Sequence, residues 1–246
     1  MKLSIVIPAH NEADCIEKTV LGLVYHLRRA SIPSEILVVN DNSTDDTGSA
    51  LKRLSAEYPE VKSIENISSK GFGFAVRMGL ENFTGDVVAI IMGDGSDAPE
   101  DVVRFFKKIS EGYDCVFGSR FVKGSTVRGY PLHKLILNRV VNQWIRFIFG
   151  IKYNDVTNAF KMYHRETIQG LRPFLSHHFN LTVEPPLKAI TRGYSYTVLP
   201  NSWTNRRSGK SKLKIKEMGS RYLFIVLYCL IEKWLSVGDY KKDRSC

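Results

Sequence analysis

Cysteine is scarce in this sequence. The 246 residues include four cysteines, and no two of them stand at the spacing of a zinc site or in the pattern of a disulfide framework. The zinc-finger and disulfide-stapled classes are therefore excluded, and a reducing cytoplasm fits this cysteine content best. The four are Cys15, Cys115, Cys229 and Cys246.

The sequence also lacks a long apolar run. The run at residues 3–9 is too short for a signal peptide and leads into His10, Asn11 and Glu12. The run at residues 222–231 is shorter than the roughly 18 apolar residues that a membrane-spanning helix needs. We therefore expect no transmembrane helix.

Acidic residues are outnumbered by basic ones. The chain has 25 Asp and Glu against 35 Lys and Arg, a formal net charge of +10 and a pI near 9.4. Such an excess implies an anionic partner: nucleic acid, a membrane surface or a phosphorylated substrate. The basic residues stand beside aliphatic segments and no nucleic-acid motif is present, so we expect no nucleic-acid partner.

Strand-like and helix-like segments alternate along the first half. The pattern predicts strands at residues 3–8, 35–40, 86–92 and 114–118, and helices near 12–30, 46–58, 72–83 and 99–111. This alternation is typical of an α/β protein with a parallel, doubly wound sheet. After residue 120 it gives way to a basic loop, an amphipathic stretch at 132–149, a short mixed segment and a basic tail that leads into an apolar helix.

An acidic loop follows the strand predicted at residues 86–92. It reads Gly93-Asp94-Gly95-Ser96-Asp97 and would lie at the carboxyl edge of the sheet, where α/β proteins bind ligands. Carboxylates there are typical of a metal or phosphate site. The alternative is structural, because Asp97 before Pro99 could cap the next helix.

Three further turns would lie along the same edge, at residues 8–12, 40–46 and 70–75. Glu12 or Asp41 could accept hydrogen bonds from a nucleobase or a ribose, and the glycine-rich turn could bring backbone amides to a phosphate. The alternative is that Asn11 and Ser43 cap helices and that Gly71-Phe-Gly73 is only a turn.

Taken together, these segments resemble glycosyltransferase family 2. The resemblance is carried by Ser4-Ile-Val-Ile-Pro-Ala-His-Asn-Glu12, Val38-Val-Asn-Asp41-Asn-Ser-Thr-Asp45, Gly71-x-Gly73-x-Ala75 and the Asp94 loop. It implies a GT-A (Rossmann-like) fold, a doubly wound mixed sheet with a C-terminal amphipathic or apolar helical extension, and a nucleotide-sugar site. The implied nucleotide-sugar-binding residues are Pro8, Asn11, Glu12, Asn40, Asp41, Gly71, Gly73, Asp94 and Lys212.

The second half resembles one branch of that family, the dolichol- or polyprenyl-phosphate mannosyltransferases. The matching segments are Gly118-Ser-Arg120-Phe-Val-Lys-Gly124, Lys134 with Asn138 and Asn142, Asp155-Val-Thr-Asn158-Ala-Phe160-Lys161, and Arg206-Arg-Ser-Gly209-Lys-Ser-Lys212. The resemblance implies phosphate contacts by Arg120, Lys134 and Arg206. We expect one catalytic domain at residues 1–215, with a nucleotide-sugar half at 1–120 and an acceptor half at 121–215, followed by a membrane-surface helix and tail at 216–246. The expected catalytic residues are Asp94, Arg120, Lys134, Asp155 and Arg206.

Two departures from the family pattern affect the site. Lys134 stands where these enzymes commonly carry arginine, so one phosphate contact would be a point charge in place of a bidentate fork. Met92 stands at the first position of the family's D-x-D motif, which leaves Asp94 as the main expected ligand of a Mg²⁺ or Mn²⁺ ion, with Ser96 or Asp97 and the donor's phosphates completing the site.

The expected reaction is an inverting transfer of a sugar to dolichyl or polyprenyl phosphate. Mannose from GDP-mannose is favoured over a UDP-sugar. A lipid phosphate is ionised at neutral pH and needs no strong base, whereas a saccharide or protein hydroxyl acceptor would need one, and Asp155 or Glu184 could serve. A further alternative is a non-catalytic nucleotide-sugar-binding protein, which Met92 suggests.

Two stretches predict contact with a membrane surface. Apolar residues recur at helical spacing over residues 132–149 with basic residues between them. Residues 206–216 contain six Lys or Arg and no acid, directly before the apolar helix at 221–234. We therefore expect a peripheral protein on the cytoplasmic face of a membrane. The alternative is that both helices pack on the sheet and the charges form a solvated face.

Overall fold

A seven-stranded mixed sheet forms the centre of the molecule. The structure is a computed structural model and describes residues 1–205 and 215–242. The strands are β1 (Leu3–Ala9), β2 (Ser34–Asn40), β3 (Val61–Glu65), β4 (Val87–Ile90), β5 (Cys115–Ser119), β7 (Lys161–His164) and β8 (Tyr196–Pro200). Their order is β3-β2-β1-β4-β7-β5-β8, and β7 is antiparallel to both of its neighbours while the other pairs are parallel.

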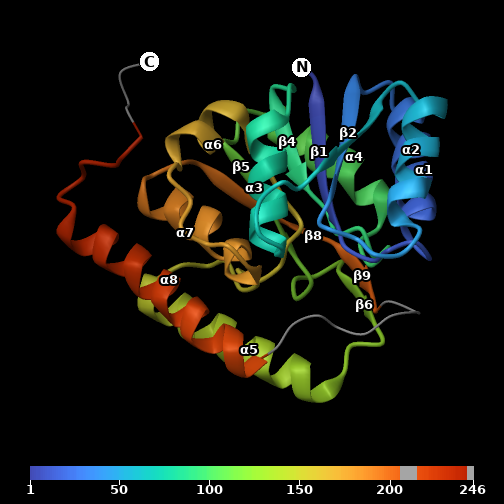
Figure 1. Ribbon diagram of the computed structural model, residues 1–246. Coiled ribbons are helices and arrows are strands. Elements are labelled where there is room, and N and C mark those ends of the chain that lie inside the picture. The colour runs from blue at the N-terminus through green and yellow to red at the C-terminus, as the bar shows by residue number, and fades with distance from the viewer. Residues whose placement is uncertain (206–214, 243–246) are drawn as a thin grey trace.

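Helices cover both faces of this sheet (Figure 1). One face carries α1 (Ile16–Arg29), α2 (Thr47–Glu57) and α4 (Pro99–Ile109), and the other carries α3 (Phe72–Asn82), α6 (Arg165–Gly170) and α7 (Glu184–Thr191). Side chains along β1 alternate between the faces, so Ile5 and Ile7 pack against α1 and α4 while Val6 packs against α3. Both faces are therefore buried, which is why β1 is apolar throughout.

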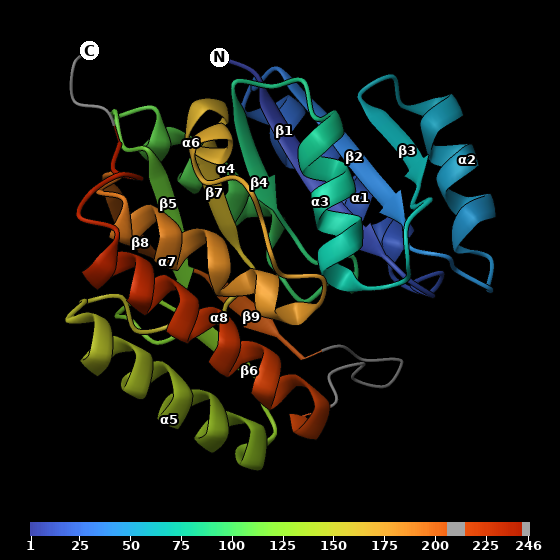
Figure 2. The same cartoon turned by 60° about the vertical axis from the view of Figure 1, so that its left-hand side comes forward.

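Helices α5 (Leu132–Phe149) and α8 (Ile215–Leu235) lie side by side outside the α7 layer (Figure 2). Each buries only one side. Ile145 and Phe149 of α5 and Ile225 and Val226 of α8 join the apolar cluster that includes α7. Beside this pair, β6 (Thr126–Arg128) and β9 (Ser202–Thr204) form a small parallel sheet.

The alternation in the first half predicted its elements well. The expected strands at 3–8, 35–40, 86–92 and 114–118 are β1, β2, β4 and β5, and the four expected helices are α1 to α4. The purely parallel sheet was wrong, because β7 inserts antiparallel between β4 and β5. The resulting mixed sheet is the arrangement that the resemblance implied. Strand β3 was missed because its exposed positions interrupt the apolar run.

The structure has no helix with both the length and the apolar character needed to cross a bilayer, within residues 1–205 and 215–242.

Candidate functional site

The carboxyl ends of β1, β2 and β4 bring the predicted nucleotide-sugar loops together. Pro8 pairs with Val39 on one side, and Val6 pairs with Ile90 on the other. The turns that contain Glu12, Asp41 and Asp94 therefore leave the sheet at one edge. The predicted convergence of these loops is confirmed, because parallel neighbouring strands end at the same side of a sheet.

Asp41 is held rigidly at this edge. Its side chain is buried and accepts hydrogen bonds from the Asn66 amide at 2.7 Å and from the backbone amide of Gly71 at 3.0 Å. The glycine turn contacts Asp41 through this amide, which is therefore already bonded within the protein. Gly73 has a packing reason as well, since a Cβ there would lie 2.4 Å from the carbonyl carbon of His177.

Asn11 and Asn40 fasten the loops to one another. The Asn11 side-chain oxygen accepts the Thr44 amide at 2.8 Å. The Asn40 amide donates to both carboxylate oxygens of Glu65, and its oxygen accepts the Ser43 amide. Neither Asn11 nor Ser43 caps a helix, because α1 begins after Cys15 and α2 after Asp46. The described contacts of Asn11 and Asn40 hold the neighbouring loops in place. Nucleotide contact by either residue stays a prediction.

The acidic loop after β4 places two carboxylates in a buried position. Asp94 is 8 % exposed and accepts the Ser96 amide at 3.1 Å. Asp97 is 6 % exposed and accepts the Met92 amide at 3.3 Å. Burial and the neighbouring Asp94 carboxylate raise the pKa of Asp97 to about 7. Asp97 does not cap α4, whose N-cap residue is Ala98 without a side-chain bond, so the capping alternative was wrong.

Arg120 and Asp155 form a buried, bidentate ion pair. The guanidinium Nε and Nη2 donate to the two carboxylate oxygens at 2.9 and 2.8 Å, and the Arg120 backbone amide donates to the same carboxylate. Burial alone would lower the pKa of Arg120, but the Asp155 carboxylate outweighs it and raises that pKa. Asp155 is fully buried, so its described contacts orient Arg120. Direct catalysis by Asp155 stays a prediction.

Aromatic rings surround Arg120 on its other sides. The guanidinium carbon lies 5.5 Å from the ring centre of Tyr130, 5.6 Å from that of Phe121 and 6.0 Å from that of Trp203. These distances are within the range of cation–π contact. The sequence analysis did not select Tyr130 or Trp203. Each is an aromatic residue in a short segment that also contains an arginine and a proline or asparagine, and this combination is the signal that could have found them.

A pocket of about 410 Å³ joins these charged groups to the groove between α5 and α8. Its polar end holds Asp97, Arg120 and Lys134, and its other end is apolar. The lining therefore combines charged side chains with aliphatic and aromatic ones. The apolar end is lined by Leu137, Val141, Trp144 and Ile145 of α5 and by Tyr222, Leu223 and Val226 of α8.

Polar residues of α5 attach that helix to the segment around Asp155. The amides of Asn138 and Asn142 both donate to the Thr157 hydroxyl, at 2.8 and 2.9 Å, and the Thr157 amide donates to Asn142. Lys134 lies one turn before Asn138 on the same helix, which places its side chain in the pocket wall. The predicted motif of Lys134, Asn138 and Asn142 therefore connects α5 to the charged end of the pocket.

Glu184 is not placed to act as a base. Its side chain is fully buried, forms an ion pair with Lys188 at 2.6 Å, and accepts the amides of Leu175 and Ser176. These contacts use both carboxylate oxygens in holding the segment before α7, so the structure contradicts the suggestion that Glu184 could be a general base. Two further expected site residues, Arg206 and Lys212, lie outside the described residues.

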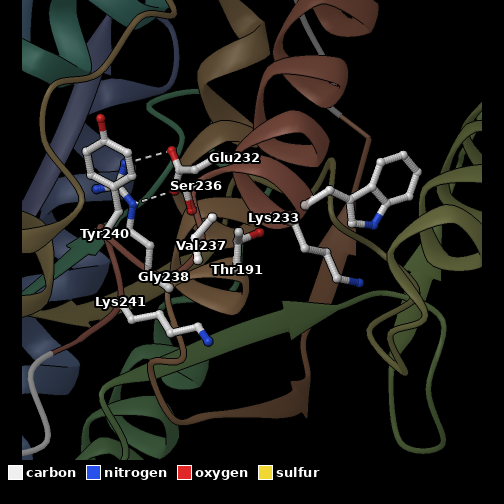
Figure 3. A pocket seen from close by; sticks show the side chains of 10 residues that line it. Thr191, Glu232, Lys233, Ser236, Val237, Gly238, Tyr240 and Lys241 are labelled. Atoms are coloured by element: carbon white, nitrogen blue, oxygen red, sulfur yellow. Dashed lines mark hydrogen bonds and ion pairs between the residues drawn. The ribbon is translucent and has the colours of Figure 1, made fainter.

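A second pocket, of about 200 Å³, lies at the end of α8 (Figure 3). Its principal charged pair is Arg192 with Glu232, joined at 2.7 Å and almost fully buried. None of the predicted site residues lines this pocket. The first pocket is therefore the candidate active site.

Comparisons with known proteins identify the family. The family model described as Glycosyl transferase family 2 matches residues 4–172. A polyprenol monophosphomannose synthase of Mycolicibacterium smegmatis is 30 % identical over 85 % of this chain and 80 % of its own length. An undecaprenyl-phosphate mannosyltransferase of Micrococcus luteus is 27 % identical over 95 % of this chain and 96 % of its own. A dolichol-phosphate mannosyltransferase of Pyrococcus furiosus is 31 % identical, and the match spans 60 % of that protein.

Solved structures show the same fold. Glucosyl-3-phosphoglycerate synthase from Mycobacterium tuberculosis in complex with uridine diphosphate matches 94 % of this chain and 79 % of its own, with a TM-score of 0.69 at 18 % identity. The same enzyme with Mn²⁺, uridine-diphosphate-glucose and phosphoglyceric acid matches the same shares with a TM-score of 0.67 at 19 % identity. At such low identity the likeness establishes the GT-A fold.

Proposed function

Because the chain belongs to glycosyl transferase family 2, we propose that it transfers mannose from GDP-mannose to a polyprenyl or dolichyl phosphate at the cytoplasmic face of a membrane. The names of the relatives from three organisms support both the sugar and the class of lipid. The observation that carries the proposal is the pocket whose charged end meets an apolar groove.

The pocket has the two characters that a lipid phosphate requires. Arg120 and Lys134 at its charged end suit a phosphate, and the Asp155 carboxylate fixes the guanidinium before any ligand arrives. The groove between α5 and α8 suits an aliphatic chain, because its walls are Leu, Val, Ile and aromatic side chains. A small polar acceptor would not fill the groove or contact its apolar wall.

The phosphate acceptor also removes the need for a base. One phosphate oxygen attacks the anomeric carbon, the bond from that carbon to the diphosphate oxygen breaks, and GDP leaves with the bonding electrons. A phosphate monoester with a second pKa near 6 is already ionised at neutral pH. A hydroxyl acceptor would need a base, whereas Asp155 and Glu184 are both fully buried and ion-paired. The described contacts therefore favour the phosphate over the hydroxyl.

A divalent cation fits the loop after β4. Carboxylates and hydroxyls are hard oxygen donors of the kind that Mg²⁺ and Mn²⁺ prefer, and the loop offers Asp94 and the hydroxyl of Ser96. The cation, when bound, neutralises the charge that develops on the leaving diphosphate. Pro8, Glu12 and Asp41 lie at the neighbouring strand ends and would hold the nucleoside.

Exposed apolar stripes on α5 and α8 suit a membrane surface. On α5, Ile136, Val140, Trp144 and Phe147 are all more than 40 % exposed and recur every three or four residues. A second such stripe lies on α8. The packing alternative, in which both helices are covered by the sheet, does not account for these side chains. The stripe on α8 consists of Leu223, Phe224, Leu227, Ile231, Trp234 and Leu235.

The test is a transfer assay with the purified full chain. A panel of GDP- and UDP-sugars is incubated with a short-chain polyprenyl phosphate and Mg²⁺ or Mn²⁺, and the lipid is analysed by mass spectrometry. We expect one product, the mannosyl phosphoryl lipid, from GDP-mannose only. The matched control is the same polyprenol without its phosphate, which should stay unmodified.

Other results would separate the alternatives. A product from a UDP-sugar would show that the donor is not GDP-mannose. Glycosylation of the free polyprenol would show that the acceptor group is a hydroxyl and not a phosphate. Binding of donor without turnover on either lipid, under conditions in which a related enzyme is active, would overturn the transferase proposal in favour of a non-catalytic nucleotide-sugar-binding protein.

A further inference from the structure

The loop after β4 faces the pocket with one residue that is a poor ligand for a hard cation. Met92 lines the pocket two positions before Asp94. Its thioether is a soft donor and does not suit Mg²⁺ or Mn²⁺, which prefer oxygen ligands. Without the donor, Asp94 alone would hold such a cation weakly, because sites of this kind commonly rest on one or two carboxylates plus substrate phosphates.

Asp97 is a second carboxylate at the same place. It lines the pocket together with Met92 and Arg120, and it is 6 % exposed. Its Oδ2 atom accepts the Met92 amide, and among the described residues no cationic side chain lies within ion-pair distance of it. Arg120 is the nearby candidate, but its Nε and Nη2 donate to Asp155. A buried carboxylate without a counter-charge is costly until a proton or a bound cation neutralises it.

The backbone around Asp97 keeps this carboxylate in position. Asp97 forms an isolated antiparallel bridge with Trp203 of β9, and the carbonyl of Ser96 accepts the Thr204 amide at 2.9 Å. The loop is thus fastened to the small sheet on one side and to β4 on the other. Helix capping does not explain the position of Asp97, because α4 begins without a side-chain cap.

We propose that Asp97 supplies the carboxylate that Met92 cannot, so that Asp94 and Asp97, together with Ser96, hold the divalent cation. The inference rests on the proposed nucleotide-sugar chemistry, but it does not depend on the identity of the acceptor. It also gives Met92 a role, because an apolar side chain at that position extends the wall of the pocket toward the acceptor groove.

Binding of Mn²⁺ to the purified full chain tests the proposal directly. Free and bound Mn²⁺ are separated by electron paramagnetic resonance during a titration in the presence of GDP. We expect Asp97→Asn to weaken Mn²⁺ binding by about tenfold or more. Met92→Ala should stay within about twofold of the wild type, since a thioether contributes little to this site. Asparagine keeps an oxygen that can accept the Met92 amide, so the loop retains its fastening.

A double variant sharpens the assignment. Asp97→Asn combined with Met92→Asp removes the carboxylate at position 97 and supplies one at position 92. This double variant should recover most of the lost affinity for Mn²⁺. Wild-type affinity in Asp97→Asn would overturn the proposal. These measurements contain no lipid, so their outcome is independent of whether a lipid phosphate is the acceptor.

A second measurement needs no variant and so does not depend on the folding of Asp97→Asn. Crystals of the wild type are soaked with Mn²⁺ and GDP, and the anomalous signal of manganese is located. We expect a peak in contact with carboxylate oxygens of both Asp94 and Asp97. A peak that touches Asp94 but not Asp97 would overturn the proposal.

Discussion

The two halves of the chain use their surfaces in opposite ways. Among the described residues, the first half exposes three large apolar side chains, Met1, Tyr25 and Ile67, whereas the second exposes fourteen, nearly all on α5 and α8. The first half instead bonds its polar side chains to one another across the strand ends, as Asp41 does with Asn66. A small polar donor suits the first surface, and an amphipathic acceptor suits the second.

The charged end of the pocket lies where these two surfaces meet. Arg120 follows β5 at the end of the first half, and its partner Asp155 comes from the second. The contact therefore couples the donor edge to the acceptor groove. Its counterpart elsewhere is Arg192 with Glu232, which has similar bidentate geometry and burial but lies at the other pocket. Substitutions in the two ion pairs can therefore be compared, which separates the effect of such a contact on sugar transfer from its effect on stability.

The largest effect is expected from Arg120→Lys. Lysine keeps the charge beside Asp155 but cannot reproduce the planar fork, so it cannot hold the carboxylate and present a further donor to a phosphate. We expect the rate of sugar transfer to fall by on the order of 100-fold. The measurement is kcat with saturating GDP-mannose and short-chain polyprenyl phosphate, together with the affinity for GDP, which should change little.

Arg192→Lys is the matched control for this substitution. It alters a buried bidentate pair of the same type without approaching the candidate active site. Its thermal stability should fall about as much as that of Arg120→Lys, while its rate stays close to the wild type. Equal loss of rate in the two variants would mean that Arg120 acts through folding and has no part in acceptor binding.

The halves also differ in how far the sequence predicted them. Elements β1, β2, β4 and α1 to α4 follow from local periodicity, because each apolar pattern belongs to one strand or helix. Strand β7 could not be found this way, since its place between β4 and β5 depends on residues more than 40 positions away. Local pattern carries no information on that pairing.

The same limit applied to the candidate site. The position of Asp94 was predictable from strand ends, and motifs of a known family selected Arg120 and Asp155, but not the ion pair between them. The packing of Gly73 against His177 and the aromatic rings around Arg120 were not predictable, because they join segments that are distant in the sequence. Glu184 was misread because its partner Lys188 lies one helical turn away, and only the structure shows that both are buried.

A smaller effect is expected when the apolar surface of α5 is made charged. Ile136 is 56 % and Phe147 85 % exposed, so Ile136→Glu with Phe147→Glu should leave the fold intact. Partial insertion of two such side chains in a membrane contributes roughly 1–3 kcal/mol, so vesicle binding should weaken by about tenfold or more. Co-sedimentation with vesicles of phosphatidylcholine and phosphatidylglycerol measures it.

Ile67→Glu provides the control from the other half of the chain. Ile67 is 88 % exposed and lies near the donor edge, away from α5 and α8. Its replacement should not change vesicle binding. If the two α5 substitutions and the control all bind vesicles as the wild type does, the apolar stripe of α5 is not a membrane surface, and the contrast between the halves has another origin.

The smallest effect concerns the first half alone. Glu35 lies at the start of β2, away from the site, and is 2 % exposed. Burial opposes its ionisation, but hydrogen bonds from Ser4 and Thr84 and contact with Lys62 outweigh burial and lower the pKa of Glu35 from 4.5 to about 2. A lowered pKa in the folded state means that the ionised form stabilises the fold at any pH above 4.5, and that this stabilisation is lost as the pH falls toward 2.

Urea unfolding of the wild type and of Glu35→Gln, compared at each pH, isolates this contribution from the other carboxylates. We expect a difference in unfolding free energy on the order of 2 kcal/mol at neutral pH, which shrinks steadily below pH 4.5. A difference that does not change with pH would assign the effect to packing in place of charge. Transfer activity at neutral pH should be the same in both proteins, because this polar network stabilises the donor half from the end of the sheet opposite to the site.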